Sequence, residues 1–146
     1  MLTIPGVSLE TKLIDRKIAY DVIYIVDSSY VFPTLSWVKG PYSDGLSKFL
    51  ADWVEHYRAE RSDCDDFSDA AAFYARGAHR FTEGQEGVAL AFGEFYYKPD
   101  SGGAHAINAF FTVEHDALEL MFYEPQTQKV INLSQAEITS CIYCQF

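Results

Sequence analysis

The chain has 146 residues, of which 49% are hydrophobic and 16% aromatic, and its formal net charge at pH 7 is −10. This composition excludes an intrinsically disordered chain, and the charge argues against a nucleic-acid-binding protein, which would carry a basic stripe. The length predicts a single domain over residues 1–146, and no repeat or linker-like stretch divides it.

The three cysteines are Cys64, Cys141 and Cys144. The sequence contains neither a signal peptide nor an apolar stretch of membrane-spanning length. We therefore expect free thiols, a cytoplasmic location and no membrane partner. The motif "CIYC" is a C-x-x-C pair without a second pair of ligands, so neither a zinc site nor a redox site is favoured there. The sequence leaves the oligomeric state open, a homodimer included.

The first half of the chain predicts one strand and two helices. The segment Lys17–Asp27 is rich in β-branched and aromatic residues and predicts a strand, whereas Pro33, Gly40 and Pro41 indicate that a loop follows. From Ser43, apolar residues recur at helical spacing and predict an amphipathic helix. Its expected buried stripe comprises Leu46, Phe49, Leu50, Trp53, Val54 and Tyr57.

A second helix is expected to begin near Ser62. Ser62 or Asp63 can cap its first turn, with Asp65 or Asp66 at the third helical position as in a capping box. Its buried stripe comprises Phe67, Ala70, Ala71 and Tyr74, and Gly77 suits its C-terminal stop. Either capping residue places Cys64 in the first turn of this helix.

The second half of the chain predicts a run of antiparallel strands. The strand candidates are residues 88–98, 105–114, 117–124 and 129–134, whereas residues 136–146 suit either a helix or a strand. One strand, two helices and then several strands predict the α+β class.

Polar residues converge at one end of the hairpin formed by residues 105–126. If Val113 pairs with Leu118, the side-chain alternation places His105, Glu124 and Gln126 on one face that is otherwise apolar. Cross-strand neighbours lie about 4.5–5.5 Å apart, within reach of these long side chains. The alternative is that these are ordinary polar residues where strands fray into water.

Together, these residues offer the parts of a nucleophilic site. A thiol in the first turn of a helix lies at the positive end of the macrodipole, which favours thiolate. Cys64 could act as nucleophile, His105 as its base and Glu124 as the group that orients the imidazole. We expect the remaining histidines to lie at the surface; they are His56, His79 and His115.

Three motifs carry a resemblance to a known family. They are "DCDDF" at Asp63–Phe67, "GGAHAINAFF" at Gly102–Phe111 and "YEPQT" at Tyr123–Thr127. At these motifs the chain resembles the papain-like cysteine-protease domain at the C-terminus of the Marasmius oreades agglutinin, and the small bacterial and phage proteins related to that domain. The segment "SWVKGPYSDG" looks similar as well, so the likeness covers about residues 36–133.

The resemblance implies a calcium-dependent cysteine peptidase, or amide hydrolase, on a papain-like fold that acts on a peptide or protein. Two helices, the second with the nucleophile, would pack on an antiparallel sheet with the base and its partner. The family's motif positions assign the catalytic roles to Cys64, His105, Glu124 and Gln126, and metal binding to Asp65 and Asp66. The chain departs from papain-type enzymes in lacking a glutamine just before the nucleophile, so the oxyanion-hole donors stay unassigned. The agglutinin's sugar-binding lectin module has no counterpart in this sequence.

The aspartates around Cys64 allow two interpretations. Carboxylates about 4 Å from a thiolate oppose it by about 4 kcal/mol at a surface-like dielectric, and a calcium ion on Asp65, Asp66 and Asp69 would remove that penalty. Alternatively, the aspartates only cap and solvate the start of a helix.

Two further functions stay open on the sequence. A papain-like module without catalysis could bind a protein partner through the same cleft and acidic surface. An acidic protein that buffers cations or binds a basic partner is the third alternative.

Overall fold

The computed structural model describes residues 3–56, 63–80 and 88–146, and its class is α+β, as predicted. The helical segments are α1 (Gly6–Asp15), η1 (Tyr20–Val22), α2 (Leu35–Trp37), η2 (Val38–Tyr42), α3 (Ser43–His56), α4 (Cys64–Arg80) and α5 (Gln135–Thr139). The strands are β1 (Thr3–Pro5), β2 (Ile23–Tyr24), β3 (Ser29–Val31), β4 (Ala89–Leu90), β5 (Phe92–Tyr97), β6 (His105–Glu114), β7 (Ala117–Glu124), β8 (Lys129–Ile131) and β9 (Tyr143–Gln145).

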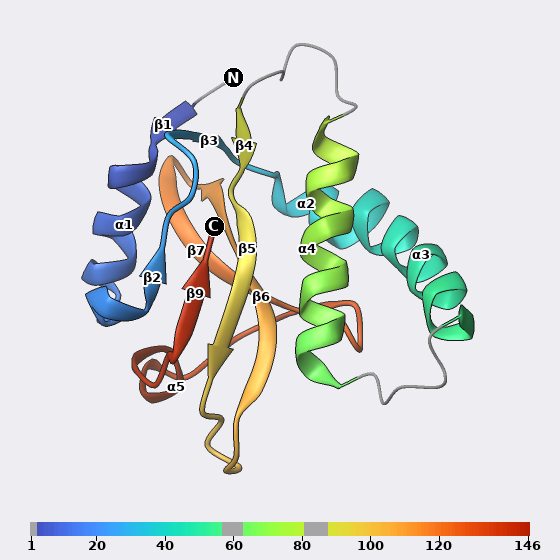
Figure 1. Ribbon diagram of the computed structural model, residues 1–146. Helices are drawn as coiled ribbons and strands as arrows, with labels where there is room; N and C mark the ends of the chain where they lie inside the picture. The colour runs from blue at the N-terminus through green and yellow to red at the C-terminus, as the bar shows by residue number, and fades with distance from the viewer. Residues whose placement is uncertain (1–2, 57–62, 81–87) are drawn as a thin grey trace.

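The strands form two sheets of mixed direction. The larger sheet has the order β2-β9-β5-β6-β7-β8 and the smaller one β1-β3-β4. The expected run of antiparallel strands is confirmed for β5, β6, β7 and β8. Two parallel pairs were not predicted: β2 runs parallel to β9, and β3 runs parallel to β4. Figure 1 shows α1 on one side of the larger sheet and α3 with α4 on the other.

The predicted register of the central hairpin is confirmed. Val113 pairs with Leu118 and Asn108 with Tyr123. His115 and Asp116 form the turn between β6 and β7, both at positive φ (50° and 63°), which suits a two-residue hairpin turn. This register brings the beginning of β6 beside the end of β7.

Strand β6 is buried on both faces. Ile107, Ala109 and Phe111 join the core cluster that contains Leu9 and Leu13 of α1. Phe110 joins a second cluster, which also includes Leu46 of α3 and Ala71 of α4. The alternation of side chains along β6 thus serves one core on each side of the sheet.

The N-terminal part of the chain differs most from the expected elements. Only Ile23 and Tyr24 of the predicted strand Lys17–Asp27 pair in the sheet, because Lys17 has a positive φ (67°) and η1 follows. Helix α1 was not predicted, although Leu9 and Leu13 lie four residues apart on its buried face. The expected loop after Asp27 contains β3, α2 and η2.

The two predicted helices exist with altered details. Leu46 and Leu50 of α3 are buried as expected, whereas Tyr57 and the side chains of Trp53, Val54 and His56 lie outside the described residues. Helix α4 does not stop at Gly77 but continues to Arg80. His79 is consequently buried near the end of α4, not at the surface, and its Nε2 lies 3.0 Å from the Val88 carbonyl oxygen.

The C-terminal segment combines both candidate states, a short helix (α5) and then β9. All three cysteines are free thiols, as expected, and Cys141 and Cys144 are buried in the core. No helix in the described ranges is long and apolar enough to cross a membrane.

A methyl group added at Gly93 would clash with the backbone, whereas one added at Gly77 would find free space. A Cβ at Gly93 would lie 1.8 Å from the backbone oxygen of Gln145, so Gly93→Ala must push β9 away from β5. We expect a loss of about 1–3 kcal/mol or more in the free energy of unfolding. A Cβ at Gly77 within α4 would meet nothing within 4 Å, so Gly77→Ala should instead gain about 0.5–1 kcal/mol.

Urea denaturation of the two variants and the wild type measures both effects. Equal stabilities for Gly93→Ala and the wild type would contradict the close approach of β9 to β5.

Candidate functional site

A hydrogen bond joins His105 and Glu124 at one end of the sheet. Nε2 of the imidazole lies 2.6 Å from Oε2 of the carboxylate, and the two side chains are only 25% and 12% exposed. His105 is the first residue of β6 and Glu124 the last of β7, so the register of the hairpin creates the pair. The ring of Tyr97 packs edge-on against the imidazole, 6.0 Å between centroids.

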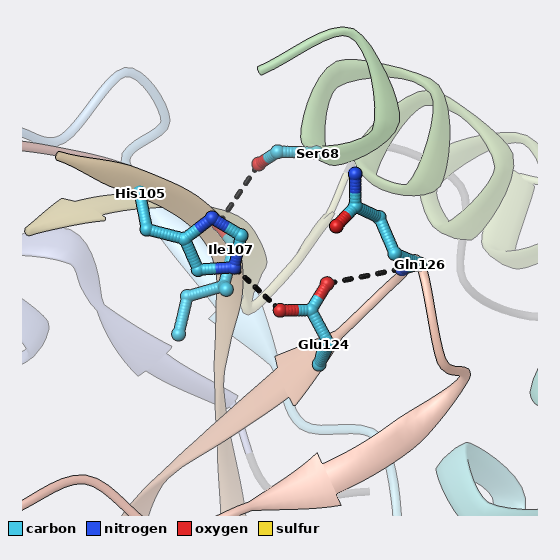
Figure 2. A network of polar contacts seen from close by, with 5 residues as sticks. All are labelled: Ser68, His105, Ile107, Glu124 and Gln126. Carbon is cyan, nitrogen blue, oxygen red and sulfur yellow. Dashed lines mark hydrogen bonds and ion pairs between the residues drawn. The ribbon is translucent and has the colours of Figure 1, made fainter. Parts of the chain in front are cut away.

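The pair has a defined orientation. Because a carboxylate can only accept, Nε2 of His105 donates to Glu124, and Nδ1 makes no hydrogen bond within the described part of the chain. The backbone N–H of Gln126 donates to the other carboxylate oxygen at 3.0 Å. Figure 2 shows the Gln126 side chain directed toward the helix that carries Ser68. The structure thus brings together three of the four predicted catalytic residues.

Cys64, the fourth of these residues, is the first residue of α4. Its side chain is partly exposed, and Asp63 before it closes the first turn. The Asp66 carboxylate accepts from the backbone N–H of Asp63 at 3.3 Å, which is half of the predicted capping box. The thiol therefore lies at the positive end of the α4 macrodipole, as expected.

The direction of α4 places Cys64 at the same end of the fold as His105. Near its start, Asp69 accepts from the hydroxyl of Tyr96 at the far end of β5, and at its other end His79 contacts Val88, just before β4. Helix α4 therefore runs antiparallel to β5 and parallel to β6 (Figure 1).

Hydrogen bonds at Ser68 join α4 to β6. Ser68 donates to the carbonyl oxygen of Ile107 at 2.8 Å. Cys64 precedes Ser68 by one turn, about 6 Å along the helix, and His105 precedes Ile107 by two residues, about 6.6 Å along the strand. Both residues are displaced in the same direction from the contact.

The Cys64 thiol and the pair of His105 and Glu124 are not directly connected in the described part of the chain. Among the described residues, no hydrogen bond links the Cys64 thiol to His105 or Glu124. By alternation, the His105 side chain leaves β6 on the face of Ile107, whereas Asn108 faces α4. The imidazole and the thiol can therefore meet only around the beginning of β6.

Negative charges are crowded around the start of α4. A hydrogen bond to the Asp65 carboxyl and the charges of Asp65 and Asp66 raise the pKa of Asp63. On the neighbouring strand, burial and the nearby Asp69 carboxylate raise the pKa of Glu94. The start of α4 and the neighbouring part of β5 therefore carry a concentration of negative charge.

The described residues do not by themselves make a calcium site. Among them, no group of three or more His, Cys, Asp or Glu side chains is placed to hold a metal ion. Asp66 is engaged in the helix cap, and Asp69 accepts from Tyr96 at 3.3 Å. Since calcium takes six to eight oxygen ligands, Asp65 and Asp66 would need further donors to hold the ion.

Ser68 and Asn108 belong to this region but were missed in the sequence. Both are fully buried and hydrogen-bonded to each other. A usable signal was present at Asn108, a single polar residue in the middle of the otherwise apolar strand "HAINAFF". Ser68 gave no such signal, because serine is common in the first turns of helices.

A separate cavity of about 220 Å³ lies near the other end of α4. It is lined by Val31, Phe32, Pro33, Thr34, Trp37, His79 and Leu90. It contains none of the predicted site residues.

Comparison with known proteins gives similarity at the level of the fold. No protein-family model and no curated protein matches the chain. A solved structure described as the PSL1a–E64 complex matches with a TM-score of 0.67 and 24% identity. Polyporus squamosus lectin bound to the human-type influenza-binding epitope Neu5Acα2-6Galβ1-4GlcNAc matches with a TM-score of 0.71 and 22% identity. Each covers 99% of this chain, which spans about half of each matched chain (51% and 50%).

These comparisons correct the functional prediction. The expected resemblance to part of a fungal agglutinin is confirmed only as a fold shared with another fungal lectin. The prediction of a calcium-dependent cysteine peptidase or amide hydrolase is wrong, because the similar structures are of a lectin and neither is described as a peptidase. The comparisons give no support to the expected peptide or protein substrate, and one of the similar structures holds a glycan epitope.

The predicted metal sites at Asp65 and Asp66 can be tested by calcium titration. If these carboxylates bind calcium, the ion should stabilise the fold by about 2.7 kcal/mol at 100 times its dissociation constant. The double variant Asp65→Asn/Asp66→Asn should lose this gain, and magnesium serves as the control ion. An unfolding temperature that is unchanged at millimolar calcium would contradict the prediction.

Proposed function

We propose that the chain forms a covalent bond between Cys64 and an electrophilic ligand, with His105 as the base for the thiol. The observation that supports this proposal best is the 2.6 Å contact between Nε2 of His105 and Oε2 of Glu124. This contact lies at the end of the sheet where α4 begins. The finer description of the fold as papain-like belongs to the same proposal, because it requires a thiol at a helix start beside an imidazole and a carboxylate on strands.

The orientation of the imidazole suits a base. Glu124 accepts from Nε2, which leaves the lone pair of Nδ1 to take a proton. When that proton arrives, the carboxylate stabilises the imidazolium that forms. The N–H of Gln126 holds the second carboxylate oxygen and so keeps the pair in place.

The position of Cys64 suits a nucleophile. The orphan N–H groups of the first turn of α4 favour negative charge on the sulfur. The carboxylates of Asp63, Asp65 and Asp66 lie in the same turn or next to it. An imidazolium at His105 would add the positive charge that stabilises a thiolate in these surroundings.

The proposed step is nucleophilic attack. The thiol proton moves to Nδ1 of His105, the sulfur of Cys64 bonds to the electrophilic carbon, and the bond from that carbon to its leaving atom breaks. The leaving atom then receives the proton from Nδ1. Hydrogen bonds of this kind are often long in unliganded proteins and tighten only when the ligand binds, which fits the separate thiol and imidazole of this structure.

Alkylation of Cys64 by iodoacetamide tests the proposal, with peptide mass spectrometry to locate the label. General-base assistance contributes about 10²–10⁴-fold, so His105→Ala should slow the reaction at neutral pH by about 100-fold, and Glu124→Gln should slow it less. The matched control is His115→Ala, at an exposed turn position of the same hairpin. Equal rates for His105→Ala and wild type would contradict the proposal.

A second candidate function is glycan binding, favoured by the glycan complex of Polyporus squamosus lectin. The chain spans about half of the matched lectin chain, so glycan binding by the whole lectin does not assign it to this half. The test therefore uses this chain by itself. Titration with Neu5Acα2-6Galβ1-4GlcNAc should give saturable binding, and Galβ1-4GlcNAc without the sialic acid is the matched control. An absence of binding by the sialylated trisaccharide would rule out this candidate.

A further inference from the structure

We infer that Ser68 and Asn108 are positioning residues, whose buried hydrogen bonds hold the start of α4 against β6 and so set the approach of Cys64 to His105. This inference rests on the proposed function, because it concerns the same thiol and imidazole. Neither residue belongs to the reacting groups themselves.

The two side chains tie three elements together. The Ser68 hydroxyl donates to the Ile107 carbonyl oxygen at 2.8 Å. The Asn108 amide donates to the Ser68 carbonyl oxygen at 2.9 Å and to the Gly93 carbonyl oxygen at 3.0 Å, with a longer contact of 3.3 Å to the Ser68 hydroxyl. Helix α4, strand β5 and strand β6 therefore share one polar junction, part of which Figure 2 shows.

The junction is polar in a place where apolar residues would suffice. Ser68 and Asn108 are each 0% exposed, and around them α4 meets the sheet through Ala71, Phe92 and Phe110. Burying such groups is costly unless they are hydrogen-bonded, and replacing both partners by apolar groups can be nearly neutral for stability. We therefore assign the junction to position rather than to stability.

Position matters along the axis of α4. Apolar contacts are non-directional, whereas the hydrogen bonds of 2.8 and 2.9 Å between α4 and β6 depend on distance and angle and fix the helix at one point. Cys64 lies one helical turn before that point on α4, and His105 lies two residues before it on β6. Both are therefore displaced from it in the same direction along the parallel helix and strand. The junction is thus placed to hold the thiol and the imidazole at a constant separation.

The chain offers a matched control on the same strand. Thr112 lies four residues beyond Asn108 on the same face of β6 and is 1% exposed. Its hydroxyl has no hydrogen-bond partner within the described part of the chain. The substitution Thr112→Val therefore changes a buried polar residue of β6 without touching the junction.

The experiment compares Ser68→Ala, Asn108→Leu and Thr112→Val with the wild type and His105→Ala. The rate of Cys64 alkylation by iodoacetamide is measured across pH, on proteins that far-ultraviolet circular dichroism shows to be folded. A misplacement of about 1 Å can lower a reaction rate by about 100-fold. Ser68→Ala and Asn108→Leu should therefore react more slowly than the wild type by up to about tenfold, and their pH profiles should follow that of His105→Ala. Thr112→Val should keep the wild-type rate and profile.

Each outcome bears on the inference. If the folded Ser68→Ala variant, the milder of the two, keeps the wild-type rate and pH profile, the inference is overturned while the proposed function stands. If Thr112→Val slows the reaction as much as Ser68→Ala, the effect is one of general stability, and the inference is again overturned. If wild type and His105→Ala already react alike, the proposed function itself fails, and the positioning role fails with it.

Discussion

The antiparallel register of β6 and β7 is the constraint on which the site depends. With Val113 opposite Leu118, the first residue of one strand and the last of the other reach the same end of the sheet, and His105 meets Glu124 at 2.6 Å. Because side chains alternate with a period of two, a slip of one residue would send one partner to the opposite face. The two-residue turn at His115 and Asp116 makes such a slip unfavourable, since both residues already have the positive φ that the turn needs.

A second constraint comes from the burial of both faces of β6. One face packs against α1 and the other against α3 and α4, so every residue of the strand from Ala106 to Thr112 is buried. This arrangement allows a polar junction beneath α4 and the hydrogen-bonded pair of His105 and Glu124 at the sheet's end. The two polar features lie within three residues of each other on β6, at His105 and Asn108.

The sequence predicted the parts of this fold that local periodicity controls. The hairpin register, the helix around Leu46 and Leu50, and the cap before Cys64 follow from alternation, helical spacing and capping chemistry. The structure has the first two and half of the capping box. Gly77 misled the prediction because a glycine can also lie inside a helix when tertiary contacts support it. The parallel pairings of β2 and β3 depend on contacts distant in sequence, and two- or three-residue strands leave too little periodicity to read.

The candidate site was predictable in part for the same reason. His105, Glu124 and Gln126 converge through one local hairpin, so their meeting could be foreseen. The relation of Cys64 to them depends on how α4 lies on the sheet, where Ser68 and Asn108 form hydrogen bonds between the two. No spacing in the sequence reveals this arrangement. The functional prediction rested on resemblance to a peptidase domain, and the lectin structures that share the fold overturned it.

The central claim is that Cys64 and His105 act on one ligand, and a crystal structure of the chain after reaction with iodoacetamide tests it most directly. We predict a thioether at the Cys64 sulfur, with His105 Nδ1 within hydrogen-bonding distance of the adduct and Nε2 still on Glu124. A label on another residue in place of Cys64, or an imidazole that stays out of reach of the modified sulfur, would contradict the claim.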